Sequence, residues 1–474
     1  MDKPYYLAGT WGRDGEPFEV RSPGSGEVVG TTYRPGEEAV EQAVEAAVGT
    51  FMEKETLPCY RRVEILRAIA GGIEQMSAEF AEMIAREVGK PIRTARGEVS
   101  RAVQTFNEAA EECSRLYGEV IPLDVAAASA GRVGITRLMP LGPVLAITPF
   151  NFPLNLVAHK LAPAIAAGCT VVLKPSSEAP LTSLLLADVI DKAGLPAGSL
   201  SVLPLAGNVT EKLAGRPGFK RVTFTGSADV GWRLKIAAWD KKVTLELGGN
   251  AAVIVHEDWP DLEGAARRIT MGGYAFAGQV CISVQRIYIH ERSAARFVDL
   301  FVRMVKELRV GDPLSEETDV GPMITEAEAE RVERWVDEAI AGGARALIGG
   351  RRNGVFYEPS VLDGVLPGMK VAAEEIFGPV TCIFTYSDFG EALEAVNDSR
   401  FGLQAGIYTK DIDLVCMAFD ELDVGGVIAG DVPTFRVDRM PYGGVKASGT
   451  GREGLRYAIR EMCEPRLLVI APGT

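Results

Sequence analysis

Residues 144–174, VLAITPFNFPLNLVAHKLAPAIAAGCTVVLK, carry the pattern that decides the fold. Val144–Ile147 and Thr170–Lys174 are short apolar runs, and the stretch between them, Asn155–Ala167, has the length and apolar content of a buried helix. A helix between two such runs predicts a crossover unit whose strands are parallel and buried on both faces. We therefore expect an α/β protein built on a parallel sheet.

The alternation of strands and helices continues to residue 247. A second helical stretch is Leu181–Ala193, and the further apolar runs are Ser201–Leu203, Arg221–Thr225 and Val243–Leu247. Five strands within about a hundred residues are typical of a nucleotide-binding domain, where ligands bind beyond the carboxyl ends of the strands.

The flanking regions predict further structure. Residues 1–115 are expected to be helical after a short β-like start, with a break at Gly89-Lys90-Pro91. Residues 117–139 predict an antiparallel hairpin that leaves the domain, and Glu464–Ile470 a strand that pairs with it, within or between subunits. A second α/β region is expected from Asn250, with strands at Ala251–Val255, Arg286–His290, Phe356–Leu362 and Val380–Tyr386.

Composition narrows the class of protein. A chain of 474 residues with 47% hydrophobic residues predicts two or three globular domains. The formal net charge of −14 argues against a nucleic-acid or anionic-membrane partner. The seven cysteines form no C-x-x-C pair, the first residues show no secretory signal, and no uncharged run could span a bilayer. We expect a cytoplasmic protein with no metal site.

The motif Gly278–Ser283 offers a candidate nucleophile, Cys281. With only three histidines in the chain, a Ser-His-Asp triad has little material, so cysteine is the natural candidate. The alternative is a buried, inert thiol, as most free cysteines are.

Two other motifs supply groups that a thiol nucleophile needs. Glu246 ends an apolar run before Gly248 and Gly249, and apolar surroundings raise a carboxyl pKa into the range of a general base. Asn151 follows the run Val144–Ile147, where its amide could donate to an oxyanion. The plainer alternatives are a surface glutamate at a strand end and an asparagine in a proline turn.

These three motifs stand in a fixed order with four more. The others are Lys174-Pro175-Ser176-Ser177, Phe224-Thr225-Gly226-Ser227, Glu374-Glu375-Ile376-Phe377-Gly378-Pro379 and Pro441-Tyr442-Gly443-Gly444-Val445-Lys446. Together they resemble the aldehyde dehydrogenase superfamily over essentially the whole chain. The runs Gly278–Arg286 and Pro433–Asp438 look most like the branch of lactaldehyde, phosphonoacetaldehyde and non-phosphorylating glyceraldehyde-3-phosphate dehydrogenases.

The resemblance implies a domain organisation. It assigns a Rossmann-like parallel-sheet cofactor domain to residues 1–116 and 140–247 and an α/β catalytic domain to residues 248–445. Residues 117–139 and 446–474 match a small β oligomerisation arm. Family subunits are joined by such arms, so the resemblance implies a homodimer or homotetramer.

The resemblance also implies a reaction, the NAD(P)+-dependent oxidation of a small aldehyde to its carboxylic acid. Cys281 matches the thiolate that attacks the aldehyde, and Asn151 matches the amide that holds the oxyanion together with the backbone N–H of the cysteine. Hydride leaves to the nicotinamide, and Glu246 matches the base that activates water to hydrolyse the thioester.

NAD or NADP is the implied cofactor. Lys174 and Glu375 match residues that hold the adenosine ribose and the nicotinamide ribose, and Phe377 matches a ring near the nicotinamide. The turn Gly226-Ser227 matches the segment beneath the pyrophosphate, at a helix N-terminus. The other positions assigned to the cofactor are Thr148, Pro149, Phe150, Ser176, Ser177 and Leu247.

One departure bears on cofactor choice. Many NAD-preferring members carry an acidic residue three positions after the lysine, whereas this chain has Ser177 there and Glu178 one position later. A carboxylate would repel the 2′-phosphate of NADP, and a serine would not. We therefore expect NADP to be accepted.

For the substrate, Arg101 and Arg436 match arginines that hold the anionic end of an aldehyde in relatives. Phe152, which stands where some relatives carry His or Tyr, and Ser283 are the other positions assigned to the substrate. The alternative for each arginine is an ordinary ion pair. Val280 stands where some relatives carry a further arginine, which favours a small hydroxylated or singly charged aldehyde. Gly430 stands where relatives often carry Asn.

Two other functions remain open. A CoA-acylating aldehyde dehydrogenase generally lacks the deacylating carboxylate, whereas Glu246 is present. A catalytically silent binding protein on the same fold would be expected to lose the thiol, the amide or the base.

Overall fold

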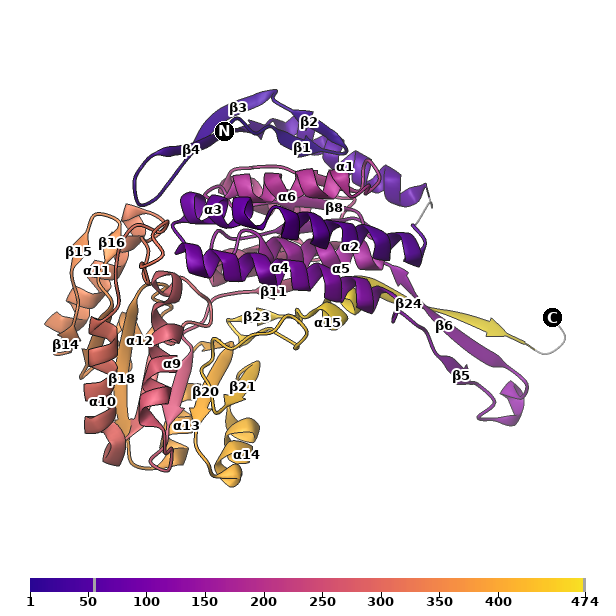
Figure 1. The fold of residues 1–474 in the computed structure, drawn as a ribbon. Coiled ribbons are helices and arrows are strands. Elements are labelled where there is room, and N and C mark those ends of the chain that lie inside the picture. Colours follow the sequence, from indigo (N-terminus) through magenta and orange to yellow (C-terminus); the bar gives the residue numbers. More distant parts are fainter. Residues whose placement is uncertain (54–56, 472–474) are drawn as a thin grey trace.

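Two mixed β-sheets, each covered by helices on both faces, form two domains (Figure 1). The computed structural model describes residues 1–53 and 57–471. The strands of the first sheet are β1 (Tyr5–Leu7), β2 (Thr10–Gly12), β7 (Val144–Ile147), β8 (Val171–Lys174), β9 (Leu200–Val202), β10 (Arg221–Thr225), β11 (Lys242–Glu246) and β23 (Gly449–Thr450). Their order is β2-β1-β9-β8-β7-β10-β11-β23.

The five central strands, β9-β8-β7-β10-β11, are parallel, which confirms the crossover pattern predicted from the sequence. Val144 and Ala146 of β7 pack into the core on one face, and Leu145 and Ile147 into the core on the other. This alternation follows from the two-residue period of a strand. The first core involves α2 (Cys59–Gln75), α3 (Ser77–Val88), α4 (Ile92–Cys113), α5 (Asn155–Ala167) and α6 (Pro180–Lys192), and the second involves α1 (Glu37–Met52), α7 (Thr210–Gly215) and α8 (Ala228–Ala237).

The second domain has the sheet order β14-β17-β18-β13-β12-β20-β21. Its strands are β12 (Ala252–Val255), β13 (Arg286–His290), β14 (Arg345–Ile348), β17 (Ser360–Asp363), β18 (Val380–Tyr386), β20 (Gln404–Tyr408) and β21 (Gly426–Ala429). Its helices are α9 (Leu262–Tyr274), α10 (Glu291–Lys306), α11 (Glu326–Ala341), α12 (Lys370–Ala373), α13 (Phe389–Asn397) and α14 (Ile412–Glu421).

One predicted strand is two separate strands. The run Phe356–Leu362 divides into β16 (Phe356–Tyr357), which pairs with β15 (Arg352–Asn353), and β17 in the main sheet. Pro359 lies between them and has no N–H to donate to a ladder, so one continuous strand was the wrong prediction. The β-like start of the chain is also longer than expected, because it includes the hairpin β3 (Gly15–Arg21) and β4 (Val28–Pro35).

A three-stranded arm projects from the body of the molecule (Figure 1). It consists of β5 (Val120–Pro122), β6 (Val133–Pro140) and β24 (Cys463–Ile470) in the order β24-β6-β5. The predicted hairpin and its pairing with the C-terminal strand are confirmed within the chain. Of residues 446–462, β23 extends the first sheet and α15 (Leu455–Glu461) packs against α4 and α5.

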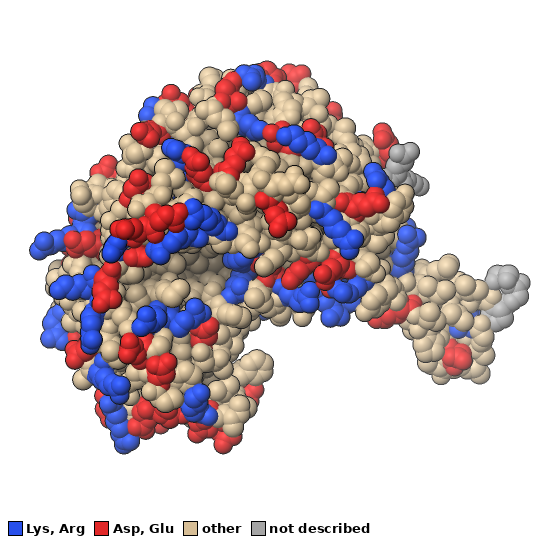
Figure 2. Space-filling view, viewed as in Figure 1, with Lys and Arg blue, Asp and Glu red and all other residues tan. Residues whose placement is uncertain are grey.

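The remaining short elements are the pair β19 (Phe401–Gly402) and β22 (Val445–Lys446) and the turns η1 (Ala127–Ser129), η2 (Gly207–Val209) and η3 (Ala275–Gly278). None of the helices in the described residues is long and apolar enough to cross a membrane. Figure 2 shows acidic and basic side chains intermixed on one face, with a hollow where the two domains meet.

A buried ion pair ties helix α4 to the loop that follows β7. The chain breaks between α3 and α4 as predicted, with Gly89 at a φ of 71°. Lys90 and Glu98 form an ion pair whose side chains are both 0% exposed, and Lys90 also donates to the carbonyl oxygen of Asn151 at 2.6 Å. The carboxylate of Glu98 accepts from the backbone N–H groups of Leu154 and Asn155 at 2.9 and 3.1 Å, which satisfies free donors at the start of α5.

Replacement of Lys90 by methionine is expected to destabilise the first domain strongly. The variant leaves the Glu98 carboxylate buried without its counter-charge, which costs about 3–5 kcal/mol of the free energy of unfolding. Urea unfolding followed by circular dichroism measures the loss. Arg96→Met is the matched control, because Arg96 lies on α4, the helix of Glu98, but in an exposed ion pair with Glu316, so its loss should change stability little. Equal losses in the two variants would contradict this account.

Candidate active site

The predicted thiol lies on a constrained loop. Cys281 is half-buried and follows Phe276 and Ala277, whose φ angles of 49° and 53° lie in the left-handed region that non-glycine residues rarely adopt. Gly278 continues this turn at a φ of 69°, and a Cβ atom there would overlap the carbonyl oxygen of Gly378. The loop is therefore held in a strained conformation, of the kind that is common at functional sites.

The predicted oxyanion donor reaches this loop from the first domain. Asn151 is buried beyond the carboxyl end of β7, and its Nδ2 donates to the carbonyl oxygen of Gln279 at 3.0 Å. An amide nitrogen has two N–H bonds, so this bond leaves one donor for another acceptor. The Asn151 amide therefore contacts the backbone two residues before Cys281.

The predicted base is buried at the carboxyl end of β11. Glu246 is 3% exposed, and neither of its side-chain oxygens has a hydrogen-bond partner within residues 1–53 and 57–471. Burial raises the pKa of Glu246 well above its ordinary value, and the neighbouring charge of Glu453 raises it further. A carboxyl group in this environment is a proton acceptor that is not committed to any protein donor.

The thiol and the base act on each other electrostatically. Burial raises the pKa of the Cys281 thiol to about 11, while a hydrogen bond with Tyr442 and the charge of Arg436 act in the opposite direction. The Sγ atom of Cys281 lies 3.0 Å from the hydroxyl oxygen of Tyr442. The charge of Glu246 contributes to raising the thiol pKa. The residue after Tyr442 adjoins this base, because a Cβ atom at Gly443 would lie 2.8 Å from an oxygen of Glu246. Cys281, Glu246 and Asn151, far apart in the sequence, therefore converge on one site.

Comparison with known proteins identifies the family of the chain. The profile of the aldehyde dehydrogenase family matches residues 11–468. The chain belongs to the aldehyde dehydrogenase family. It is accordingly an NAD(P)-dependent oxidoreductase with the α/β fold of that family.

Three similar proteins illustrate the relationship. A 3-sulfolactaldehyde dehydrogenase of Priestia megaterium is 45% identical over 466 residues, which cover 98% of this chain and 97% of that protein. The crystal structure of aldehyde dehydrogenase 21 from Physcomitrella patens, in complex with the reaction product succinate, superposes with a TM-score of 0.98 at 43% identity and covers 100% of this chain and 99% of that chain. The crystal structure of the glyceraldehyde-3-phosphate dehydrogenase GapN of Methanocaldococcus jannaschii, complexed with NADP, has a TM-score of 0.92 at 39% identity. The match covers 97% of this chain and 100% of that chain.

In this aldehyde dehydrogenase the strand ends that would face the cofactor carry free polar groups. Lys174 at the end of β8 is 5% exposed and donates only to the carbonyl oxygen of Pro175, at 3.2 Å, among the described contacts. Burial, together with the charge of Arg34, lowers the pKa of Lys174 to about 8. The hydroxyls of Thr148 and Thr225, after β7 and at the end of β10, are buried without a partner in the described part of the chain. These groups fit the hydroxyl-rich ribose and phosphates of NAD(P).

A second group of predicted cofactor residues lies around the glycines that follow Glu246. The backbone N–H of Gly249 donates to Glu375 at 2.9 Å, and a side chain at Gly248 would overlap that carboxylate. Burial raises the pKa of Glu375 to about 7. Phe377 has a left-handed φ of 44°, and its ring lies edge-on to Phe150 at 6.1 Å between centroids.

The remaining predicted cofactor positions occupy the same strand edge. Pro149 is half-buried directly after Thr148, and the turn Gly226-Ser227 opens helix α8. The Ser177 hydroxyl donates to the carbonyl oxygen of Leu205 at 3.3 Å, and the Ser176 hydroxyl accepts from the backbone of Glu178. The backbone N–H of Leu247 donates to Ser448 at 3.0 Å, which joins β11 to the C-terminal segment.

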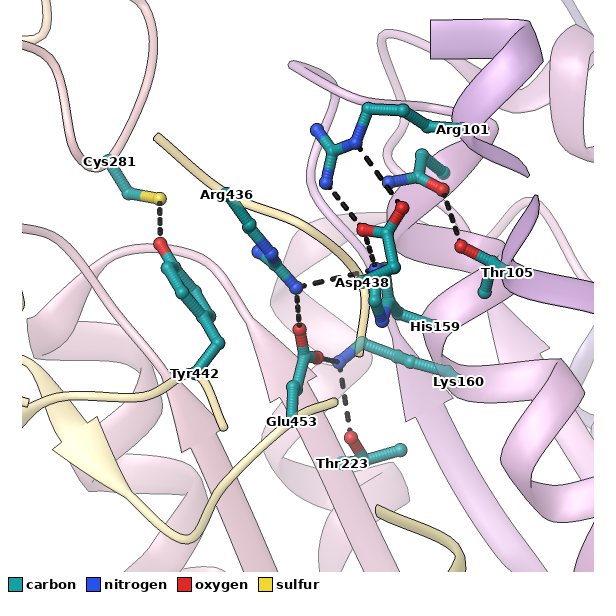
Figure 3. Close-up of polar contacts among 11 residues, drawn as sticks. Arg101, Thr105, His159, Lys160, Thr223, Cys281, Arg436, Asp438, Tyr442 and Glu453 are labelled. Carbon is teal, nitrogen blue, oxygen red and sulfur yellow. Dashed lines mark hydrogen bonds and ion pairs between the residues drawn. The ribbon is translucent and has the colours of Figure 1, made fainter. Parts of the chain in front are cut away.

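The two predicted substrate arginines lie in a buried network of charges (Figure 3). Arg436 donates to Glu453 at 2.9 Å, and Arg101 donates to Asp438 at 2.6 Å. His159 of α5 lies 2.8 Å from Asp438 and 3.4 Å from Arg436, so it connects the two pairs. Both arginines therefore form ion pairs within the protein, which was the alternative to substrate binding.

Arg436 nevertheless keeps a free donor. Its Nε–H is buried and has no acceptor among the described residues, and its side chain is 8% exposed. Arg101 is more open, at 28%, and its guanidinium lies 6.0 Å from the ring of Phe152. The hydroxyl of Ser283, the fourth predicted substrate position, is taken up by a backbone contact, because it donates to the carbonyl oxygen of Gly273 at 3.1 Å.

Sequence reasoning assigned no role to several residues of the site. Lys90 was seen only as part of a helix break, and Tyr442 only as part of a family motif, yet one anchors Asn151 and the other contacts Cys281. Gly430 has a φ of 76°. Glycine and asparagine are the residues that adopt this left-handed region most readily, which explains their exchange at this position.

Replacement of Glu246 by glutamine is expected to stabilise the protein at pH 8. Because its pKa is raised in the folded state, Glu246 holds a proton there at pH values where the unfolded chain has already lost it. As pH rises from the ordinary pKa to the raised pKa, the contribution of Glu246 to the free energy of unfolding therefore falls. Removing a buried charge without partners should add about 1–3 kcal/mol to the free energy of unfolding at pH 8, and less at pH 5.

Urea unfolding at the two pH values measures this difference. Glu45→Gln, on the exposed face of α1, is the matched control and should show no such dependence on pH. A gain from Glu246→Gln that does not grow between pH 5 and pH 8 would argue against a buried, partnerless carboxylate.

Proposed function

We propose that this enzyme oxidises a small hydroxylated or singly anionic aldehyde to its carboxylic acid through a covalent intermediate on Cys281. The observation that carries the proposal is the buried Glu246 carboxylate, which has no hydrogen-bond partner in the described residues. It lies against Gly443, the residue after the tyrosine whose hydroxyl contacts the thiol. A base in this state can accept a proton from water and so complete hydrolysis. A CoA-acylating enzyme would have no use for it.

In the proposed reaction Cys281, Asn151 and Glu246 act in turn. The Cys281 sulfur forms a bond to the aldehyde carbon, and the free N–H of Asn151 donates to the resulting oxyanion. NAD(P)+, when bound, accepts the hydride that this carbon loses. Glu246 then takes a proton from water as the water oxygen attacks the thioester carbon, and the C–S bond breaks to release the acid. Covalent catalysis divides one difficult oxidation into two easier steps.

The substrate class rests on Arg436. Its free Nε–H needs an acceptor, and a guanidinium favours a carboxylate or sulfonate oxygen over a neutral group. The names of two relatives point the same way, since one acts on 3-sulfolactaldehyde and another was crystallised with succinate as its product. The counter-charges of Glu453 and Asp438 reduce the net positive charge, which favours one anionic group over two.

Acceptance of NADP is supported by the surroundings of Lys174. Ser177 replaces an acidic residue, and Arg34 lies close enough for its charge to lower the pKa of Lys174. The Nε–H of Arg34 is buried without an acceptor in the described structure. A second cation with a free donor favours a 2′-phosphate. GapN of Methanocaldococcus jannaschii, which was crystallised with NADP, is a relative with the same fold.

We also propose that the arm joins two or more copies of the chain. Its apolar side chains are exposed, including Val120 at 71%, Leu467 at 54% and Leu468 at 58%. An exposed apolar sheet with open edges is a surface that proteins normally cover. A monomeric mass in solution would contradict this assignment.

Single-turnover kinetics test the covalent, hydrolytic route. Glu246→Gln is expected to give a burst of NAD(P)H of about one equivalent per site, followed by steady turnover slowed by about 10²–10⁴-fold, because acylation needs no base and hydrolysis does. Cys281→Ser should give neither burst nor turnover. Full steady-state activity of Glu246→Gln would sink the hydrolytic assignment, and turnover that requires CoA would support the acylating alternative.

A panel of aldehydes tests the role of Arg436. In Arg436→Met, kcat/KM for carboxylate- or sulfonate-bearing aldehydes should fall about tenfold to a hundredfold relative to neutral aldehydes, since one charge-assisted hydrogen bond is lost. Arg439→Met is the matched control, because Arg439 lies three positions later and is 65% exposed. An equal loss on neutral and anionic aldehydes would remove Arg436 as the anion anchor.

The wild type should be assayed with both cofactors. A preference for NAD above a hundredfold would contradict the acceptance of NADP.

A further inference from the structure

Tyr442 places a hydroxyl group directly against the proposed nucleophile. Its oxygen lies 3.0 Å from the Sγ atom of Cys281, and its side chain is 3% exposed. The next residue, Gly443, is equally close to the proposed base, because a Cβ atom there would lie 2.8 Å from an oxygen of Glu246. One turn of chain therefore adjoins both the thiol and the carboxylate.

The phenol ring is held firmly in this position. The guanidinium carbon of Arg436 lies 3.7 Å from the ring centroid, and Arg436 is in turn fixed by Glu453. The backbone of Tyr442 exchanges two hydrogen bonds with the backbone of Glu453, at 3.1 and 2.6 Å. Ile282 and Leu403 pack with the ring in one apolar cluster. Figure 3 shows Tyr442 between Cys281 and Arg436, with its hydroxyl pointing to the sulfur.

We infer that Tyr442 is a catalytic residue that donates its O–H to the Cys281 thiolate and so keeps the nucleophile available in a buried site. The inference rests on the proposed covalent function and adds a partner for the sulfur that the family motif alone did not assign. Burial raises the pKa of Tyr442 well above its ordinary value, so the phenol keeps its proton. A protonated phenol can act toward a thiolate only as a donor.

The proposed step balances without a further reactant. The S–H bond of Cys281 breaks and its proton passes to solvent, while the Tyr442 O–H forms a hydrogen bond to the sulfur anion. When the sulfur bonds to the aldehyde carbon it loses its negative charge, and the hydrogen bond weakens. The face of the ring toward Arg436 is also favourable, because a cation over a phenol ring makes its O–H a stronger donor. No electron is gained or lost by the protein.

The test measures the thiol rather than turnover. Wild type and Tyr442→Phe are alkylated with iodoacetamide between pH 6 and pH 10, and mass spectrometry follows the peptide that contains Cys281. Loss of one hydrogen bond to a charged atom should slow alkylation of Cys281 at pH 8 by about tenfold or more and move its pH midpoint upward. Burst formation with an aldehyde should slow by a similar factor, while KM for NADP stays unchanged.

Tyr408→Phe is the matched control. The hydroxyl of Tyr408 is buried and has no partner in the described residues, so its removal should leave the alkylation profile unchanged. Site-specific 3,5-difluorotyrosine at position 442 keeps the side-chain shape and makes the O–H a stronger donor, so alkylation at pH 8 should be faster than in the wild type. This second variant keeps the inference testable if Tyr442→Phe does not fold.

The outcomes separate two hypotheses. An alkylation profile of Tyr442→Phe equal to that of the wild type, with aldehyde turnover intact, would overturn the role of Tyr442 and leave the proposed function standing. Slow alkylation in Tyr442→Phe together with no NAD(P)H from any aldehyde in the wild type would support the hydrogen bond and overturn the proposed function.

Discussion

The buried carboxylate of Glu246 is the constraint around which the site is built. A carboxyl group without a hydrogen-bond donor is unfavourable inside a protein, so the surrounding structure must hold it there. The pairing of β11 with β23 sets Glu246 opposite Gly449, and the N–H of Leu247 is bonded to the carbonyl oxygen of Ser448. The C-terminal segment thereby closes over the strand end, and it brings Tyr442 to the thiol in the same turn.

The charges beside this carboxylate form one connected system. Asp438, Arg436 and Glu453 come from the C-terminal segment, while Lys160 and His159 come from α5 (Figure 3). Although burial alone would raise the pKa of Glu453, the charges of Lys160, His159 and Arg436 lower it to about 2. Glu453 thus remains ionised, and its charge adds to the effect of burial that raises the pKa of Glu246. The same network positions the ring next to the sulfur and the arginine proposed to meet the far end of the substrate.

Much of the fold follows from local sequence pattern. The strand Val144–Ile147 and the helix Asn155–Ala167 have the predicted bounds. The strand is apolar throughout, and the helix is mostly apolar and ends before Gly168. The division of Phe356–Leu362 could also have been predicted from Pro359, which separates the apolar pair Phe356-Tyr357 from Val361-Leu362.

The site was only partly predictable. Glu246, Asn151 and Cys281 stand in recognisable motifs, whereas the partners of Arg101 and Arg436 are set by contacts between segments far apart in the chain. Tyr442 stands in a recognisable motif, but a buried tyrosine is usually a core residue, and nothing in the sequence indicated that its hydroxyl contacts Cys281. The left-handed turn at Phe276 and Ala277 was likewise unpredictable, since neither residue type favours it and only packing imposes it.

The order of the arm strands has a consequence for biosynthesis. β5 and β6 precede most of both domains in the sequence, whereas their third strand, β24, follows them. Because synthesis runs from the N-terminus, the hairpin emerges without the strand that completes its sheet. The arm sheet is completed only after both domains have been synthesised.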